Sequence, residues 1–320
     1  MTPRLRRGLQ VAGWIVATAL IVFCLRESNG AQAREIFRLV QWRWIVVALI
    51  ANALILVSWT ALWCTVAPSG ERVSFRTMFE INAITSALMN TVPFLGGHAA
   101  AVLLLIKRGG MTQHGALSVM ALDQLGEGMS KVAIFAVVAA FAPIPAWMRA
   151  GIATICLAVL VLLLSLVVAA HGHAWIRGRD DANKGLVGRG RRYLGEWASR
   201  METLRSARQS ALALVFAVGT KATEGVAILA VQYALGVQLS IGATALVLAG
   251  VVLGSILPVA PGNIGTYETG AFLAYRHLGV EPAMATILAV ALHICFLIPS
   301  VGIGYVIGSW KLGSAKLAAS

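Results

Sequence analysis

The chain has 320 residues, of which 58% are hydrophobic and only 12% are charged, and its mean hydropathy is +0.80. This composition excludes a soluble globular protein, because too few polar residues are present to cover its surface. The formal net charge is +13, but the basic residues lie between apolar runs. They therefore favour contact with anionic lipids at a membrane surface, and no nucleic-acid partner is predicted.

The N-terminal apolar run, residues 9–25, follows three arginines and precedes the tripeptide Ala-Gln-Ala at 31–33. This order of features resembles a secretory signal with a cleavage site. We favour a retained first span, because Arg26 and Glu27 separate the run from the small residues and further spans follow.

The apolar runs predict an all-α polytopic membrane protein that forms a single domain over residues 1–320. Full spans are expected near 9–25, 44–66, 115–142, 150–170, 209–235 and 283–308. Two further segments, about 78–106 and 240–275, are interrupted by proline and glycine and are expected to form re-entrant or broken helical hairpins. The four cysteines lie in apolar runs without metal-type spacing, so no metal or cofactor is predicted.

The loop 171–208 sets the orientation, because it carries nine basic residues against four acidic ones. Such a loop is cytoplasmic by the positive-inside rule, and counting spans outward places both termini in the cytoplasm of a bacterial-type inner membrane. The arginine-rich segment 26–43 then lies outside, which fits the rule poorly. Apolar residues at helical spacing between Tyr193 and Leu204 predict a helix in the headgroup layer, with a solvated linker as the alternative.

With this orientation the two hairpins enter from opposite sides, so residues 44–142 and 209–308 are expected to be inverted repeats. A gapless comparison of the hairpins pairs Pro93 with Pro261 and Gly97 with Gly265. Interruptions at corresponding positions of two halves are typical of a transport site.

The breaks themselves suggest what the site binds. A new helix is expected near Gly97 and near Gly265, with Thr266 as the N-cap of the second helix and Glu268 in its first turn. Free N–H groups and the positive end of a helix dipole at membrane depth favour an anionic headgroup, especially phosphate. The alternative is that proline and glycine only kink closely packed helices.

Charged residues within the spans point to the same region. Asp123, Glu127 and Lys131 lie four residues apart on one helix face, and Lys221 and Glu224 form a second close pair. Such residues should face the interior of the bundle, because a charge at the membrane centre costs about 2.5 kcal/mol or more. The pair of Glu127 and Lys131 is either part of the site or a structural salt bridge.

Asp123 has no local partner in the sequence, which implies a bound cation, a proton or a distant partner such as Lys221. It is the first candidate for coupling transport to an ion. Further coupling candidates are Lys221, Glu224 and His293. His293 ranks last among them, because a lone membrane histidine is more often a packing residue.

The late break resembles a known family motif, Pro-Gly-Gly-x-Gly-x-x-Glu. Four residues match it and Asn263 replaces its middle glycine; the matching residues are Pro261, Gly262, Gly265 and Glu268. On this basis the chain resembles the flippase-like membrane domain of lysylphosphatidylglycerol synthases and its stand-alone relatives, including hopanoid-biosynthesis-associated membrane proteins.

Two other family motifs match less fully. Of Pro-Gly-x-x-Gly-Glu, Pro93 and Gly97 are present, but Phe94 and His98 depart from the pattern. Of acid-Arg-x-x-acid, the two acids are present as Asp123 and Glu127, but Gln124 replaces the arginine.

The resemblance implies a lipid flippase with two inverted hairpins around a central cavity. The expected substrates are lipids with anionic headgroups, hopanoids or polyprenyl lipids, and lipid-synthesis enzymes are expected as partners. Because the last span is followed closely by Ser320, we expect no aminoacyl-transfer domain and a transporter, not an enzyme. The alternatives are an intramembrane lipid-modifying enzyme and a non-transporting partner of a lipid-synthesis complex. The expected substrate-binding residues are Pro93, Gly97, His98, Asp123, Glu127, Pro261, Gly262, Asn263, Gly265 and Glu268.

Overall fold

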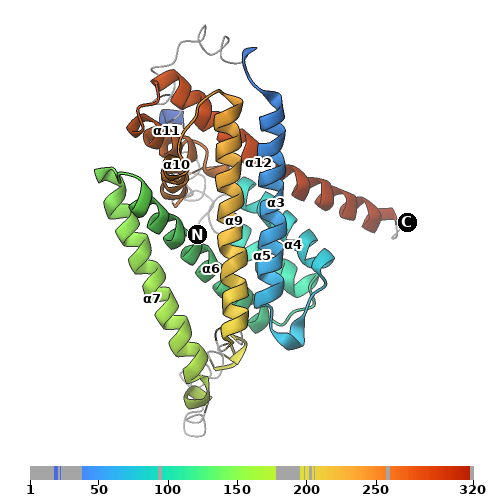
Figure 1. Ribbon diagram of the computed structural model, residues 1–320. Helices are drawn as coiled ribbons and strands as arrows, with labels where there is room; N and C mark the ends of the chain where they lie inside the picture. The colour runs from blue at the N-terminus through green and yellow to red at the C-terminus, as the bar shows by residue number, and fades with distance from the viewer. Residues whose placement is uncertain are drawn as a thin grey trace.

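The computed structural model describes residues 18–20, 22, 38–92, 96–177, 195–197, 199–201, 204, 206–256 and 260–317. Every regular element in these residues is a helix (Figure 1), as the sequence predicts. The elements are α3 (Trp42–Val66), η1 (Ser69–Glu71), α4 (Phe75–Thr91), α5 (Gly96–Lys107), α6 (Gln113–Phe141), α7 (Ala146–Arg177), α9 (Ala207–Ala234), α10 (Ile241–Gly254), η4 (Pro261–Asn263), α11 (Thr266–His277) and α12 (Pro282–Leu317).

Five of the described helices are long and apolar enough to cross a membrane. The spans are Trp42–Val66, Gln113–Phe141, Ala146–His171, Ala207–Ala234 and Pro282–Trp310. They coincide with five of the six predicted spans, and the protein is an integral membrane protein. The sixth predicted span, 9–25, lies outside the described residues except for 18–20 and 22, as does the predicted cleavage motif.

Hydroxyl side chains set where several helices begin. Each of four N-cap residues accepts a hydrogen bond from the backbone N–H three residues later; the caps are Ser74 of α4, Thr112 of α6, Ser206 of α9 and Ser240 of α10. Such a bond satisfies one of the N–H groups that the first turn of a helix leaves free. The helix starts are therefore encoded locally in the sequence.

The first interrupted segment forms α4 and α5, which pack against each other as an antiparallel pair. At the break, a Cβ added to Gly97 would lie 2.7 Å from the Cα of Met89. At the other end of the pair, a Cβ on Gly109 would lie 3.3 Å from a methyl group of Val73. Later residues of the second helix thus contact earlier residues of the first. The two helices therefore form a hairpin whose tip is the break at 92–96.

The second interrupted segment forms the same kind of hairpin from α10 and α11. Gly250 faces the backbone of Gly270, and Gly254 faces the backbone of Thr266 and the Cα of Gly270. These glycines let the two helix backbones touch, since any side chain would overlap a carbonyl group of the opposite helix. The tip of this hairpin contains η4.

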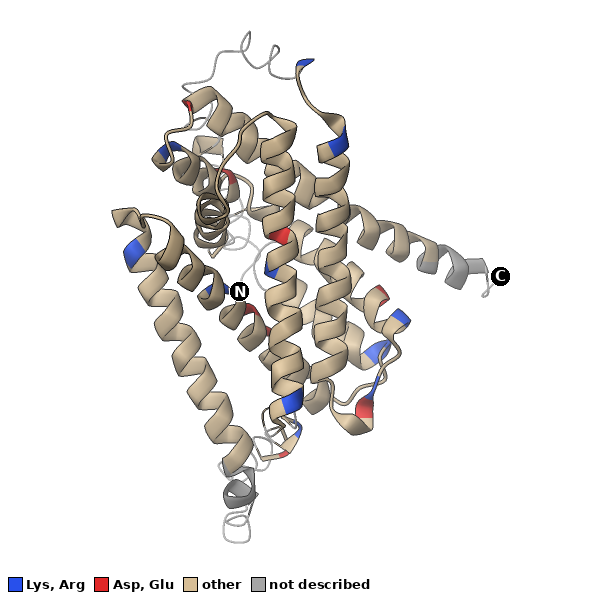
Figure 2. Ribbon diagram, viewed as in Figure 1, with Lys and Arg blue, Asp and Glu red and all other residues tan. Residues whose placement is uncertain are grey.

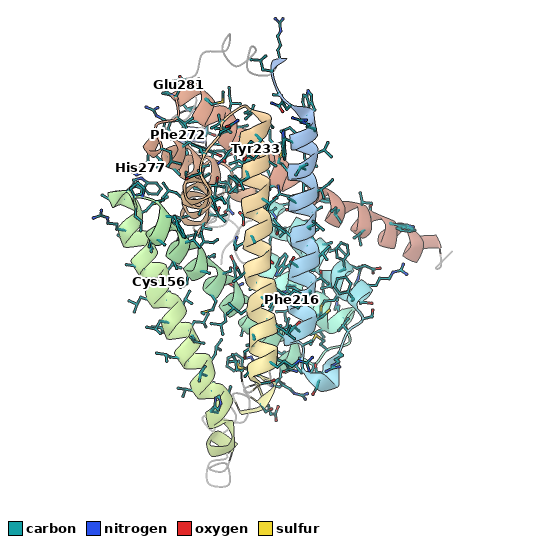
Figure 3. The ribbon with its side chains drawn as sticks, in the orientation of Figure 1. Cys156, Phe216, Tyr233, Phe272, His277 and Glu281 are labelled. Atoms are coloured by element: carbon teal, nitrogen blue, oxygen red, sulfur yellow. The ribbon has the colours of Figure 1, made fainter. Side chains whose placement is uncertain are left out.

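The open end of the second hairpin lies at one end of the bundle. There the N–H of Gln41 donates to the carbonyl of Ala234 at 2.9 Å, so α3 and α9 are antiparallel. His277 Nε2 lies 3.1 Å from the carbonyl oxygen of Pro143 in the α6–α7 connection. Figure 3 shows His277 at this upper end and Phe216, on α9, toward the opposite end.

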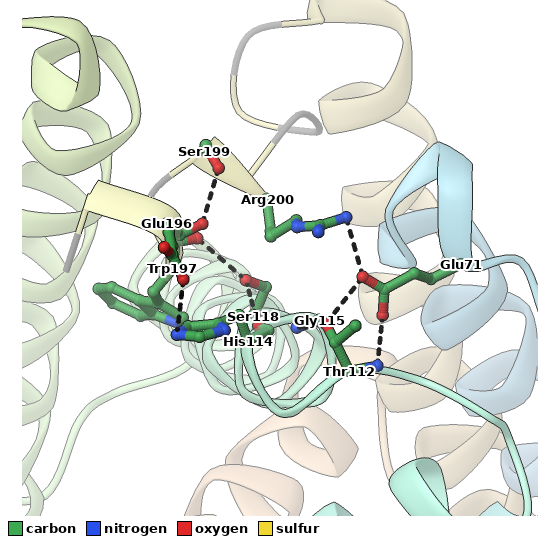
Figure 4. Close-up of polar contacts among 9 residues, drawn as sticks. All are labelled: Glu71, Thr112, His114, Gly115, Ser118, Glu196, Trp197, Ser199 and Arg200. Atoms are coloured by element: carbon green, nitrogen blue, oxygen red, sulfur yellow. Dashed lines mark hydrogen bonds and ion pairs between the residues drawn. The ribbon is translucent and has the colours of Figure 1, made fainter. Parts of the chain in front are cut away.

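The open end of the first hairpin lies at that opposite end, where a polar cluster joins three segments (Figure 4). Glu71 accepts hydrogen bonds from the N–H and hydroxyl of Thr112, both at 2.8 Å, and pairs with Arg200 at 2.9 Å. The apolar residues Trp197 and Met201 pack against α6 and α7. This packing disfavours a solvated linker, whereas the position of the segment in the headgroup layer stays a prediction; Tyr193 and Leu194 lie outside the described residues.

In each of two cases within the bundle, the first helix of a hairpin packs on a membrane span from the other half of the chain. Helices α3 and α9 lie side by side along their length (Figure 1), while α4 packs on α12 and α10 packs on α6. Helix α10 is buried over residues 242–252, at the centre of the largest apolar core. Helix α7 lies at the edge of the bundle and packs mainly against α6.

Candidate functional site

A cavity of about 550 Å³ lies between the tips of the two hairpins. This volume falls within the range of roughly 300–1,000 Å³ that is common for small-molecule sites. The first hairpin contributes Met89, Asn90 and His98, and the second contributes Pro261 and Asn263. Helices α3, α6, α7, α9 and α12 complete the walls.

The tips touch through glycine at the second break. Gly262 has a φ of 64°, and a Cβ added to it would lie 3.2 Å from the carbonyl oxygen of Asn90 on α4. Asn263 follows with a φ of 56°, a conformation that asparagine tolerates better than most residues. The two breaks predicted from the sequence thus meet in the middle of the bundle; Pro93 itself lies outside the described residues.

Gly97 has a packing role in this arrangement. It faces the backbone of Met89 and is not among the residues that line the cavity. Its neighbour His98 does line the cavity and lies 3.5 Å from the side-chain amide of Gln124. On the first hairpin, the polar side chains that border the cavity therefore include His98 and Asn90.

Asp123 has partners that sequence spacing did not reveal. Its Oδ1 accepts hydrogen bonds from the indole N–H of Trp59 at 2.7 Å and of Trp63 at 2.8 Å. Its Oδ2 accepts a longer bond, 3.3 Å, from the amide of Gln124. The carboxyl group is 2% exposed, and Lys221, the expected distant partner, is paired elsewhere. Three N–H donors on one carboxyl group suit its ionised form.

The sequence did not identify the two tryptophans as partners of Asp123, because only their spacing indicated a shared role. Trp59 and Trp63 are four residues apart in an apolar span, so they share one face of α3. Their rings meet edge to face with centroids 5.5 Å apart. Trp59 lines the cavity together with Asp123, and Trp63 is fully buried behind them.

The other charged residues of the cavity pair with one another. Lys131 contacts Glu127 at 2.8 Å, and Lys221 contacts Glu224 at 2.7 Å, which confirms both predicted pairs. Glu127 interacts electrostatically with Lys221 as well, so the two pairs form one cluster between α6 and α9. The side chain of Glu127 is 44% exposed, and it borders the cavity. Figure 2 shows charged segments midway along α9.

Glu268 and His293 form a second polar unit, behind the cavity wall. Glu268 Oε1 lies 2.8 Å from His293 Nδ1, and its Oε2 accepts the N–H of Gly265 at 2.7 Å. The predicted N-cap is therefore wrong, because Gly265 precedes the helix and Thr266 is its first residue. The carboxylate of Glu268 accepts from the N–H of the N-cap residue, as in a capping box, and it occupies an N–H group that was expected to bind a headgroup.

The wall in front of this pair is aromatic. The ring of Tyr267 stacks on His293 with centroids 4.3 Å apart and borders the cavity, which the side chains of Glu268 and His293 do not. His293 Nε2 is buried and has no hydrogen-bond partner among the described residues. The structure thus brings Glu268 and His293 together but separates them from Asp123 and Glu127.

Comparison with known proteins identifies the family. No curated protein and no solved structure matched the chain. The family model for the lysylphosphatidylglycerol synthase TM region matches residues 10–304, and this model describes a membrane region only. That match includes both hairpins, the residues that line the cavity, four of the five described spans and most of the fifth. The chain therefore belongs to the family of the lysylphosphatidylglycerol synthase TM region.

Proposed function

We propose that this protein moves a membrane lipid between the two leaflets, with the headgroup passing through the central cavity. The supporting observation is a cavity of about 550 Å³, bordered by charged side chains, between two hairpin tips in a bundle of membrane helices. Irregular backbone at membrane depth is tolerated only where protein or a wet cavity receives it. A headgroup could enter such a cavity while the acyl chains stay in the bilayer.

Repetition in the packing supports inverted repeats over 44–142 and 209–308. The hairpin helix α4 packs on α12 as α10 packs on α6, and the corresponding helices α3 and α9 are antiparallel. The open ends of the two hairpins lie at opposite ends of the bundle. In this proposal both hairpins are re-entrant, and the site opens alternately to each side.

The charged residues that border the cavity bear on which kind of headgroup it binds. Three acidic residues and two lysines border it, so it offers partners for both signs of charge. We infer that a headgroup carrying both a phosphate and an amine fits better than a purely anionic one. Hopanoids and polyprenyl lipids remain candidates from the sequence, as do lipid-synthesis enzymes as partners.

The decisive experiment is reconstitution of the full chain in liposomes with fluorescent lipids of several headgroups. Exchange of lipid between leaflets without chemical change is the expected result. A chemically modified lipid would instead make the protein an intramembrane enzyme. If correctly inserted protein neither exchanges nor modifies lipid, the remaining role is that of a partner in a lipid-synthesis complex.

Within that assay, Asp123→Asn should slow exchange more than Glu127→Gln combined with Lys131→Met. The double change removes a pair of opposite charges together, which structural salt bridges often tolerate. Asp123→Asn alters a carboxyl group that is bound only by neutral donors among the described residues. Equal exchange rates for wild type and Asp123→Asn would show that this acid is structural.

The orientation is tested by labelling Arg108→Cys and Glu281→Cys on a cysteine-free background in sealed vesicles. These exposed residues lie at the open ends of the first and second hairpins. We propose a bacterial-type inner membrane with cytoplasmic termini, so a membrane-impermeant thiol reagent should reach the two cysteines from opposite sides. Labelling of both from one side would contradict the entry of the two hairpins from opposite sides.

A further inference from the structure

A second cavity, of about 560 Å³, lies at the end of the bundle where the first hairpin opens. It is bordered by the C-terminal end of α3, the start of α4 and the start of α9. Two arginines, Arg72 and Arg208, line it, and none of the acidic residues that the structure describes does. We call this cavity the basic pocket. It is separate from the central cavity, with which it shares no lining residue.

The acidic residues near the basic pocket are engaged elsewhere. Glu71 precedes Arg72 in the chain, but its carboxylate is held by Thr112 and Arg200 (Figure 4). Glu80, on α4, pairs with Arg76. Neither Arg72 nor Arg208 forms an ion pair with any residue that the structure describes. The pocket therefore carries two positive charges that no described side chain neutralises.

The depth of the pocket matches the headgroup layer. Helix α9 has 28 residues and is about 42 Å long at 1.5 Å per residue, close to the thickness of a bilayer with its headgroups. Arg208 is the second residue of this helix, so it lies at headgroup level. The pocket opens where a lipid phosphate would be found.

The other residues that line the basic pocket can contact the remaining parts of a lipid molecule. Thr65, Ser206 and Gln209 supply polar groups beside the arginines. Phe75 and Leu212 also border the pocket, and they are 49% and 41% exposed. Apolar side chains that are exposed next to a membrane span are available to acyl chains.

We propose that the basic pocket binds the headgroup phosphate of an anionic phospholipid, with Arg72 and Arg208 as its charge partners. Arginine is suited to this role, because its planar guanidinium donates two parallel hydrogen bonds to phosphate oxygens. Basic pockets between membrane helices are known to bind anionic headgroups. This site is independent of the proposed transport, because it lies outside the central cavity and is tested by binding alone.

The test is native mass spectrometry of the full chain in detergent with phosphatidylglycerol or phosphatidylcholine of identical acyl chains. Wild type should retain phosphatidylglycerol preferentially. Arg72→Gln with Arg208→Gln should reduce that preference roughly 30-fold, since each basic side chain near an anionic lipid contributes about fivefold. Lys107→Gln with Arg108→Gln is the matched control. It removes the same charge from exposed residues at the same end, outside the pocket, and should keep the preference.

Equal binding of the two lipids by wild type would overturn the proposal, as would an equal loss in the two double variants. Displacement of phosphatidylglycerol by an equimolar amount of inorganic phosphate would also overturn it, because the pocket would then select a free anion over a lipid.

A second measurement leaves both arginines in place, in case the double variant fails to fold. Cys64 lines the pocket, so its alkylation can report occupancy when Cys24, Cys156 and Cys295 are replaced by serine. Phosphatidylglycerol should slow alkylation of Cys64 more than phosphatidylcholine does. Equal rates with the two lipids would contradict binding in the pocket.

Discussion

The hydrogen bond between Trp63 and Asp123 can be measured with a double-mutant cycle of Trp63→Phe and Asp123→Leu. Phenylalanine keeps an aromatic ring but lacks the indole N–H, which lies 2.8 Å from Asp123 Oδ1. Leucine has a shape close to that of aspartate but accepts no hydrogen bond. The volume lost from the tryptophan is the same in both backgrounds, so the cycle isolates the interaction between the two side chains.

The expected coupling energy is about 1.5 kcal/mol or more. Hydrogen bonds to charged groups contribute about 1.5–3 kcal/mol, whereas those between membrane helices average about 0.6 kcal/mol. The higher value applies here, because two short indole bonds meet on one oxygen and no described lysine or arginine pairs with Asp123. Trp59 still serves that oxygen after Trp63→Phe, which places the expectation at the lower end of the range.

The assay is unfolding of the purified full chain by sodium dodecyl sulfate, followed by far-ultraviolet circular dichroism. Trp44→Phe is the matched control, because Trp44 is on the same helix but its ring contacts Tyr233, with centroids 5.1 Å apart. Its coupling to Asp123→Leu should be close to zero. A coupling of about 0.6 kcal/mol or less for Trp63 would refute the view that indole bonds hold a charged carboxylate.

Two glycine comparisons test the hairpins. Gly262→Ala and Gly279→Ala both place alanine at positive φ, so each should destabilise the protein by about 1–2 kcal/mol in the same unfolding assay. Only Gly262→Ala should also slow lipid exchange, because its Cβ presses on the carbonyl of Asn90, whereas a Cβ at Gly279 meets open space. Equal exchange rates for the two variants would contradict contact between the tips. Gly250→Ala should destabilise by about 1–3 kcal/mol, since its Cβ would meet a carbonyl oxygen of α11. Gly219→Ala should be neutral or stabilising, because its Cβ would have no atom within 4 Å. A similar loss of stability in Gly250→Ala and Gly219→Ala would show that the close contact between α10 and α11 is unimportant.

The spans and their interruptions could be predicted from the sequence because membrane physics constrains them locally. A run of apolar residues must be helical in lipid, and proline with glycine must break it. The predicted segments 78–106 and 240–275 accordingly became the two antiparallel hairpins, with breaks at the expected positions. The pairs of Glu127 with Lys131 and of Lys221 with Glu224 followed from helical periodicity in the same way.

The partners of Asp123 could not be predicted, because they depend on how α3 packs against α6. Trp59 and Trp63 precede Asp123 by 64 and 60 residues, and no local pattern carries that register. The bond between Glu268 and His293 depends similarly on the packing of α11 against α12. The N-cap prediction failed for a different reason. Gly265, with a φ of 90°, precedes the helix without a side-chain cap, and the spacing to Glu268 does not by itself tell whether the helix begins after residue 265 or 266.

The pairing of charges within the cavity bears on how a transporter could release its substrate. Each lysine that borders the cavity already has a glutamate partner, so no ligand is needed to satisfy these charges. A phosphate that binds Lys131 must first displace Glu127, and the broken ion pair offsets most of the new one. In the proposed transport the headgroup would therefore exchange partners at a small net change in free energy. Weak net binding lets a substrate leave as readily as it enters, which repeated turnover requires.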